Sequence, residues 1–225
     1  MRDLAVLVPS FCRPDSIKRL RRAMDATCRG DTALIVGLNE DDPARDQYPE
    51  GVHYEIRSGL RFAVAWFNEL AVPAADEYRF IGALGDDFLP GTEGWDARMM
   101  EALGRTPFAF GNDLYPREPG SLPCHIFTRS EVVKALGYLG PPCFRHTWVD
   151  VAWQQWGRAC GITYLHDVII EHLHFTNGKA PVDASYAASS ALMPDDEAAY
   201  KAYCADPQGL AADIGKIAGV ALCRR

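Results

Sequence analysis

The sequence predicts an α/β fold with a mainly parallel central sheet flanked by helices. Three apolar runs point to it, at Leu4–Val8, Thr32–Leu38 and Tyr78–Leu84. The first run is continuously apolar rather than alternating, which is typical of a strand buried on both faces of a parallel sheet, and the second is predicted to be another buried strand. Helical patterns lie between the runs, and strands that alternate with helices along a chain are typical of parallel sheets.

In the first half of the chain, each element has a local start or stop signal. Pro9 ends the first strand, and Ser16 is the predicted cap of a helix with a basic outer face. The second strand breaks into the acidic segment Asn39–Pro43. The elements that follow are a short strand at His53–Ile56, a helix at Arg61–Leu70, and the strand at Tyr78–Leu84, which runs into Gly85-Asp86-Asp87.

The second half is less regular. We expect helices at 95–103, 129–136 and 149–160, strands at 108–110 and within 162–174, a Pro/Gly-rich loop at 111–124, and two terminal helices beyond Thr176. The sequence contains no internal repeat and no obvious linker, so we expect one domain. Its core is predicted at residues 1–177, and residues 178–225 form a helical extension packed on that core.

Composition narrows the class of protein. The chain has 225 residues and is 48% hydrophobic, a composition that excludes a chain disordered along its whole length. Its net charge of −7 argues against simple binding of a polyanion. No apolar run reaches the roughly 20 residues of a membrane span, and the start lacks a signal-peptide pattern. Seven cysteines without a CxxC pair argue against a disulfide framework or a thiolate zinc site. We expect a cytoplasmic protein, monomeric or dimeric.

Polar clusters follow three of the predicted strands: Ser10–Arg13, Asn39–Asp42 and Asp86–Asp87. Parallel strands bring their carboxyl ends to one edge of the sheet, where ligands bind in α/β folds. The sequence therefore predicts a ligand site at this edge. It contains no GxGxxG, GxxxxGK[ST] or GxSxG motif, which disfavours dinucleotide, Walker-type and serine-hydrolase sites.

Adjacent carboxylates at a strand end suit a hard divalent cation, and Asp86 and Asp87 have this arrangement. The alternative is that they cap a turn. His172 and His174 alternate along a predicted strand and so share a face, from which either supplies an imidazole to the same metal. The alternative for each is a structural histidine.

Asp150 precedes an aromatic-rich helix and is a candidate general base, the alternative being a first-turn acidic residue favoured by the helix dipole. Trp148 lies outside that helix and is the tryptophan we place against a sugar or base ring. Arg13, Arg129 and Lys179 are candidates for phosphate neutralisation, and the alternative for each is a solvated surface charge.

In order and spacing, these motifs resemble the large inverting family 2 of GT-A fold glycosyltransferases. The segment Leu4–Pro14 is similar to the family's opening strand followed by Pro-Ser and Arg-Pro, and Gly59 and Asn68 match its Gly…Asn helix. Gly85-Asp86-Asp87 resembles the Asp-x-Asp motif with Gly in place of the first Asp. Trp148-Val149-Asp150 resembles the acidic catalytic motif, with Val149 where Glu is usual. The compact chain also resembles small glycosyltransferases encoded by bacteriophages, for which the location is the host cytoplasm.

The resemblance implies a single Rossmann-like GT-A domain, with a nucleotide-sugar-binding half at 1–87 and an acceptor and catalytic half at 88–177. It implies inverting transfer from a nucleotide-diphosphate sugar, most simply a UDP-sugar, to a hydroxyl deprotonated by Asp150. Asp87 with His172 or His174 would hold Mn²⁺ or Mg²⁺. The implied donor-site residues are Pro9, Ser10, Arg13, Asn39, Glu40, Asp41, Asp42, Gly59, Asn68, Asp86 and Lys179. The implied acceptor-site residues are His125, Arg129 and Trp148.

Two alternatives to this function are a nucleotidyltransferase, which also places metal carboxylates at a sheet edge, and a sugar- or nucleotide-binding module without turnover. Two acceptor classes are open as well. The basic run Lys18, Arg19, Arg21, Arg22 and Arg29 favours a hydroxymethylated base in DNA, whereas the acidic composition favours a small molecule or a glycan.

Overall fold

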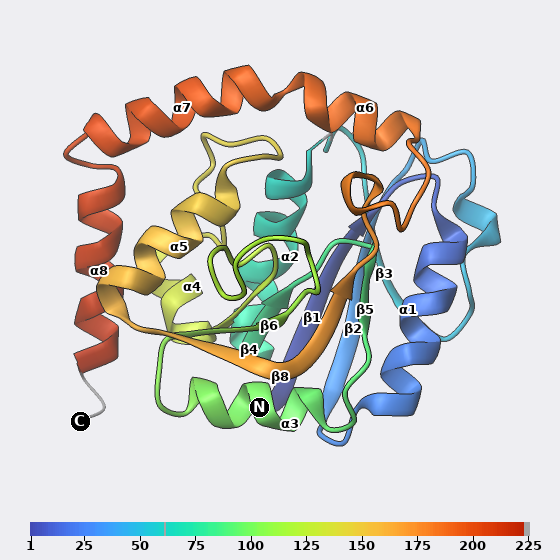
Figure 1. The fold of residues 1–225 in the computed structure, drawn as a ribbon, viewed down its shortest axis with the longest axis horizontal. Helices are drawn as coiled ribbons and strands as arrows, with labels where there is room; N and C mark the ends of the chain where they lie inside the picture. Colours follow the sequence, from blue (N-terminus) through green and yellow to red (C-terminus); the bar gives the residue numbers. More distant parts are fainter. Residues whose placement is uncertain (61, 223–225) are drawn as a thin grey trace.

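Eight strands form one sheet, in the order β3-β2-β1-β4-β7-β6-β8-β5, in the computed structural model, which describes residues 1–60 and 62–222 (Figure 1). The strands are β1 (Arg2–Ser10), β2 (Thr32–Asn39), β3 (His53–Arg57), β4 (Tyr78–Ala83), β5 (Phe88–Pro90), β6 (Phe108–Asn112), β7 (Ile126–Arg129) and β8 (Ile162–His172). The predicted α/β fold with a central sheet between helices is confirmed.

The first half of the sheet is parallel. β1 lies between β2 and β4 and pairs in parallel with both, and β3 pairs in parallel with β2. Leu4–Val8 is fully buried, as expected for a strand covered on both faces. The carboxyl ends of β1, β2 and β4 consequently lie at one edge of the sheet.

The second half is mixed. β7 is antiparallel to both β4 and β6, whereas β8 is parallel to β6 and antiparallel to β5. The pairing of β6 with β8 has a bulge between Gly111 and Asn112. β5 and β7 were not predicted, because runs of three and four residues are too short to show a period.

Helices cover both faces of the sheet. They are α1 (Pro14–Thr27), α2 (Ala63–Glu77), α3 (Trp95–Leu103), α4 (Ser130–Leu136), α5 (Val149–Cys160), α6 (Ala184–Ala191), α7 (Met193–Ala205) and α8 (Leu210–Leu222), with short 3-10 turns at Arg45–Gln47 and Phe175–Asn177. Side chains of β1 alternate between two cores: Leu4 and Val6 pack with α1 and α3, and Ala5 and Leu7 pack with α2. No helix in the described part of the chain is long and apolar enough to cross a bilayer.

Two helices, α1 and α2, differ from the prediction by more than one residue. α1 begins at Pro14 rather than after a Ser16 cap, because proline fits the first helical position, where its missing N–H is not needed. α2 runs on through Pro73 to Glu77, although Leu70 was the predicted end. The predicted first residue of that helix, Arg61, lies outside the described residues.

Three helices follow residue 177 in the described chain, where two were predicted. α6 and α7 run across the edge of the sheet where the carboxyl ends of the parallel strands lie, and α8 then descends beside α4 and α5 (Figure 1). The buried carboxylate of Asp213 fixes α8, since the hydroxyls of Tyr138 and Tyr203 both donate to its Oδ2 at 2.6 Å. The C-terminal segment is therefore built into the same body as the sheet.

Candidate active site

Loops from three parallel strands meet at one edge through direct hydrogen bonds. Ser10 Oγ, after β1, donates to Asp86 Oδ2 at 2.7 Å, and Arg13 Nη1 donates to Asp86 Oδ1 at 2.9 Å. The backbone N–H of Cys12 donates to Asp42 Oδ2, after β2, at 2.9 Å. The polar clusters that the sequence placed at this edge are thus in contact with one another.

Asp86 is the inner of the two adjacent carboxylates. It is only 6% exposed, and burial raises its pKa to about 6 even though Arg13 and Ser10 act in the opposite direction. Both of its oxygens accept hydrogen bonds from the β1 loop. Asp86 therefore joins β4 to that loop and orients Arg13.

Asp87 forms a group with two histidines. Ligand atoms of Asp87, His172 and His174 all lie within 4.8 Å of one another, and His172 Nε2 is 3.3 Å from Asp87 Oδ2. Burial alone would raise the pKa of Asp87, but the hydrogen bonds from His172 and Tyr186 hold it below its ordinary value. One carboxylate and two imidazoles on one side of a site, with other positions open, suit Mn²⁺ or a similar cation.

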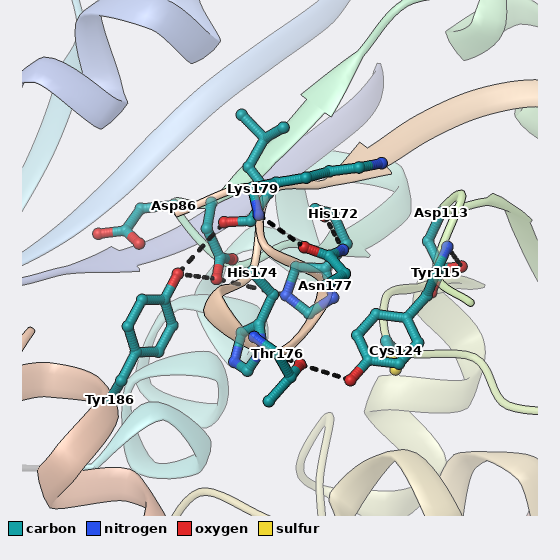
Figure 2. Close-up of polar contacts among 12 residues, drawn as sticks. Asp86, Asp113, Tyr115, Cys124, His172, His174, Thr176, Asn177, Lys179 and Tyr186 are labelled. Carbon is teal, nitrogen blue, oxygen red and sulfur yellow. Dashed lines mark hydrogen bonds and ion pairs between the residues drawn. The ribbon is translucent and has the colours of Figure 1, made fainter. Parts of the chain in front are cut away.

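Aromatic contacts fix both imidazoles. The His172 ring stacks on Phe88 with centroids 4.1 Å apart, and β5 pairs Phe88 with His172 in register. His174 lies just beyond the end of β8, where its Nδ1 contacts Thr176 Oγ1 at 2.6 Å. Figure 2 shows the two rings side by side, and their centroids are 4.9 Å apart. The sequence predicted that the two histidines share a face and that either one serves the Asp87 site; in the structure both lie beside Asp87.

The C-terminal segment adds two residues that the sequence analysis missed. Tyr186 of α6 donates its hydroxyl to Asp87 Oδ2 at 2.9 Å. Arg13 donates from Nε and Nη2 to the carboxylate of Asp183 at 2.8 Å each, and its Cζ lies 4.3 Å from the centre of the Tyr186 ring. Asp183 also caps α6 by accepting from the backbone N–H of Tyr186. That N-cap role was the only local signal available for Asp183.

Asp150 lies in the first turn of α5, beside Cys124. Its Oδ1 accepts from the backbone N–H of Val151 at 2.9 Å, and burial raises its pKa. The thiol of Cys124 is 3.9 Å from Oδ2. A half-buried carboxylate of raised pKa is a stronger proton acceptor than a solvated one, which is what a general base requires.

A short chain of polar contacts connects the two sides. Arg117 Nη2 donates to Asp113 Oδ2 and lies 3.4 Å from the Cys124 sulfur, which in turn lies beside Asp150. Asp113 is joined to β8 by the backbone hydrogen bond from the His172 N–H to its carbonyl, at 2.9 Å. These contacts link the histidine group with the Asp150 carboxylate on α5. Arg117, Asp113 and Cys124 were not among the predicted site residues.

Asp196 of α7 positions the segment that enters α5. Its carboxylate accepts from the backbone N–H groups of Arg145, His146 and Thr147 at 2.7–2.9 Å, and from Thr147 Oγ1 at 3.0 Å. Burial opposes this charge, but those donors hold the pKa of Asp196 below its ordinary value. The C-terminal extension therefore holds the Asp150 side of the site as well as the Asp87 side.

Several predicted donor-site side chains use their polar atoms inside the fold. Asn39 Oδ1 accepts from Trp66 Nε1 at 2.8 Å, and Asp42 accepts from Tyr48 and the backbone of Ala44. Asn68 is hydrogen-bonded to the 139–140 segment through both ends of its amide. These contacts shape the edge of the site.

The remaining predicted residues occupy varied positions. Glu40 and Asp41 are exposed beside Asp42, Gly59 has a positive φ of 80° ahead of α2, and Lys179 pairs with Glu171 at 2.7 Å. Pro9 belongs to β1, next to Ser10. Trp148 stacks on Tyr200 of α7 with centroids 5.0 Å apart, so one face of its ring is already covered.

Two predicted acceptor contacts are wrong. His125 is 0% exposed, its Nε2 accepts from the backbone N–H of Gly111, and burial lowers its pKa to about 3. Arg129 is opposite Phe80, in the part of β4 farther from Asp86 and Asp87, and its Nε donates to the Leu103 carbonyl at 2.6 Å. Both are core residues, since one has no exposed surface and the other stabilises the far end of the sheet.

The fold is shared with solved glycosyltransferase structures. A mannosyltransferase from Pyrobaculum calidifontis, in complex with GDP-Man and Mn²⁺, matches at a TM-score of 0.55 and 13% identity over 99% of this chain and 81% of its own. Glucosyl-3-phosphoglycerate synthase from Mycobacterium tuberculosis, in complex with Mn²⁺, UDP and phosphoglyceric acid, matches at a TM-score of 0.58 and 12% identity. The match covers 88% of this chain and 78% of the synthase chain.

TarS from S. aureus, in complex with UDP, matches at a TM-score of 0.56 and 12% identity over 75% of this chain, which spans 59% of the TarS chain. No protein-family model matches the sequence, and no curated protein matches it. At these identities the likeness shows the fold alone. The chain therefore has the GT-A fold of nucleotide-sugar glycosyltransferases, as its motif order implied.

Proposed function

We propose that the protein is a metal-dependent glycosyltransferase that moves a sugar from a nucleotide-diphosphate sugar to an acceptor hydroxyl with inversion. One observation carries the proposal: at the carboxyl edge of the sheet, the Asp87–His172–His174 group is linked by a short chain of contacts to Asp150, a carboxylate of raised pKa. The shared fold supports it, because structures with that fold are described in complex with UDP or GDP-Man and with Mn²⁺.

The donor half of the mechanism follows from the residues around Asp87. Asp87, His172 and His174 would hold Mn²⁺ or Mg²⁺, which offsets the charge that builds on the leaving diphosphate. Arg13 adds a guanidinium beside this group, and Asp86 orients it. A diphosphate would compete with the Asp183 carboxylate for Arg13, so we expect donor binding to rearrange the contact between α6 and the sheet edge.

Asp150 performs the acceptor half. Its carboxylate takes the proton from the acceptor hydroxyl as that oxygen attacks the anomeric carbon, while the bond from that carbon to the diphosphate oxygen breaks on the opposite face. The raised pKa of Asp150 brings its basicity closer to the working pH. A single displacement of this kind inverts the configuration at the anomeric carbon.

For the acceptor we propose a hydroxyl on a small molecule or a glycan. Three of the five basic residues in the run from Lys18 to Arg29 form ion pairs within the fold, since Lys18 pairs with Asp15, Arg21 with Asp25, and Arg29 with Glu93. A nucleic-acid acceptor would need phosphate contacts whose affinity falls steeply with salt. Transfer to DNA containing a hydroxymethylated pyrimidine, lost at high salt or on charge reversal of Arg19, Arg21 and Arg22, would favour the other acceptor class.

The test is a panel of nucleotide sugars incubated with the full chain, with and without Mn²⁺. We expect Mn²⁺-dependent release of a nucleoside diphosphate, even without an acceptor, because slow hydrolysis of the donor uses the same site. Release of pyrophosphate would identify a nucleotidyltransferase instead. Binding of a donor without any turnover, across the panel and with Mn²⁺ present, would identify a binding module and overturn the proposal.

A further inference from the structure

The two nitrogens of the His172 ring have different surroundings. Nε2 lies 3.3 Å from Asp87 Oδ2, whereas Nδ1 is buried and has no hydrogen-bond partner among the described residues. The ring cannot turn freely, because it stacks on Phe88 with a centroid distance of 4.1 Å and an angle of 13° between planes. A buried polar atom without a partner is costly, so a partner for Nδ1 is expected in the working state.

Asp113 is a second carboxylate near the His172 ring, besides Asp87, and could supply that partner. A ring nitrogen of His172, a carboxylate oxygen of Asp113 and the Cys124 sulfur all lie within 4.8 Å of one another. The backbone hydrogen bond from His172 N–H to the Asp113 carbonyl keeps the two residues in register. Figure 2 shows His172 between Asp86 and Tyr186 on one side and Asp113 and Cys124 on the other.

The Asp113 carboxylate has room for one more hydrogen bond. Its Oδ1 accepts from the backbone N–H of Tyr115 at 3.1 Å, and its Oδ2 accepts from Arg117. An ionised carboxylate has about four lone-pair sites, so these two donors leave capacity. The side chain is 12% exposed, which keeps competing water limited.

We propose that Asp113 is a positioning residue for the metal site and accepts a hydrogen bond from the Nδ1–H of His172. Coordination of a cation by Nε2 requires the lone pair of that nitrogen, so a neutral imidazole carries its proton on Nδ1. Histidines that bind metals usually donate this proton to a carboxylate or carbonyl, which fixes the ring and makes it a better ligand. The inference rests on the proposed function, because it takes the Asp87–His172–His174 metal site as given.

The same three residues could instead form a separate metal site, since Asp113, Cys124 and His172 are all ligand types. Arg117 argues against that arrangement. Its guanidinium donates to Asp113 Oδ2 and lies 3.4 Å from the Cys124 sulfur, so a positive charge already occupies the space beside both side chains. A second cation there would be repelled, whereas a neutral N–H from His172 would not.

The experiment measures Mn²⁺ affinity of the full chain, titrated with MnCl₂ alone and with MnCl₂ plus UDP. We expect Asp113→Leu to weaken Mn²⁺ binding by about 10–100-fold, the range found when such an outer carboxylate is removed. Asp113→Asn should lose less, because its amide oxygen still accepts a hydrogen bond. The matched control is Asp167→Asn, which removes one exposed carboxylate from β8 and should leave the affinity unchanged.

A spectroscopic readout separates positioning from a general loss of structure. In protein carrying ¹⁵N-histidine and saturated with diamagnetic Mg²⁺, with the His172 signal assigned through His172→Gln, we expect the Nδ1–H form in the wild type. The Asp113 variants should show a mixture of both neutral forms. Circular dichroism checks that each variant is folded. Should Asp113→Leu fail to fold, Asp113→Asn carries the test through the same two measurements.

Three results would overturn the inference. Wild-type Mn²⁺ affinity and an unchanged His172 signal in a folded Asp113 variant would remove Asp113 from the site while leaving the proposed function intact. Binding that survives Asp87→Ala but is lost in Cys124→Ser would place the cation on the Asp113–Cys124–His172 group. A wild-type chain that binds no Mn²⁺, with or without UDP, would overturn the metal site itself and the inference with it.

Discussion

In the parallel half of the sheet, β1 and β4 end side by side, and Ser10 and Arg13 reach Asp86 directly. In the mixed half, Asp150 lies in the first turn of α5 rather than at the end of a strand. It depends on the segment 145–147, which is held from outside by Asp196 of α7. The proposed donor side is therefore built on the sheet itself, with Asp183 and Tyr186 adding contacts from the C-terminal segment, whereas the proposed acceptor side depends on contacts between distant parts of the chain. Variants on the two sides should fail in different ways.

Asp150→Asn gives the largest expected effect. The amide preserves shape but cannot accept a proton at neutral pH, so transfer should fall by about 10²–10⁴-fold, the usual range for general-base catalysis. Donor binding with Mn²⁺ should persist, since Asp87 is untouched. Rates measured with saturating donor, beside a thermal-shift assay with nucleoside diphosphate, check both statements. Near-normal turnover would leave Asp150 as a first-turn residue of α5.

The pH profile sharpens this result. Burial raises the pKa of Asp150, and a protonated carboxyl cannot act as a base. The wild-type rate should therefore fall as the pH drops through that raised pKa, at a higher pH than an ordinary aspartate would give. Asp150→Asn should lose this dependence in whatever activity remains. The same profile in both proteins would mean that another group titrates.

Asp87→Ala tests the donor side. It removes the carboxylate of the predicted metal group, a charged ligand worth several kcal/mol, so Mn²⁺-dependent binding of a nucleoside diphosphate should weaken by about 10²-fold or more. Calorimetric titration with UDP, with and without Mn²⁺, measures this. Folding should be preserved, because Asp87 belongs to neither hydrophobic core. Retained Mn²⁺-dependent binding would contradict the metal assignment.

Asp196→Ala tests how the acceptor side is held. The substitution leaves the N–H groups of residues 145–147 without their acceptor, and unfolding free energy should fall by about 2 kcal/mol. Asp195→Ala is the matched control, because that neighbour is exposed and makes only a surface pair with Arg145. Urea denaturation compares the two. The pKa of Asp196 is lowered, so its contribution is present above the ordinary aspartate pKa and is lost as pH falls.

Tyr186→Phe has the smallest expected effect. It deletes the hydrogen bond from Tyr186 to Asp87 Oδ2 and leaves the ring in place against Arg13. Because one neutral donor no longer competes with the cation for that oxygen, Mn²⁺ affinity should rise by a few-fold, in keeping with a hydrogen bond of about 1 kcal/mol. Weaker Mn²⁺ binding would show instead that the hydroxyl orients Asp87 as a ligand.

The parallel half of the fold could be predicted because it depends on local pattern. The grouping of Asp87 with His172, 85 positions away, was predicted from ligand chemistry and from the resemblance in motif order. Continuous apolar runs identify buried strands, and polar residues at their carboxyl ends must meet at one edge. The contacts of Asp183 and Tyr186 could not be found this way. Asp183 reaches Arg13 across 170 positions and Tyr186 reaches Asp87 across 99, and no periodicity connects such distant residues.

His125 and Arg129 show the opposite error. Their residue types suggested chemistry, but β7 was not predicted, so nothing indicated that His125 lies directly before a buried strand and Arg129 at its far end. A basic or aromatic polar side chain next to an unrecognised strand is easily assigned to a site. Both side chains are buried, and burial depends on how the whole sheet is assembled, so it could not be predicted from the neighbouring residues.

The direction of β1 has a practical consequence for measurement. Its nine residues run from the edge opposite the site up to Ser10, at about 3.3 Å per residue, so a label attached at Met1 would lie about 30 Å from that serine. A chain tethered to a sensor surface through this end would turn the loops after β1 and β4 toward the solution. Nucleotide, cation and acceptor could then be added to the tethered protein in any order. The effect of each ligand on the binding of the others could be measured on one sensor surface.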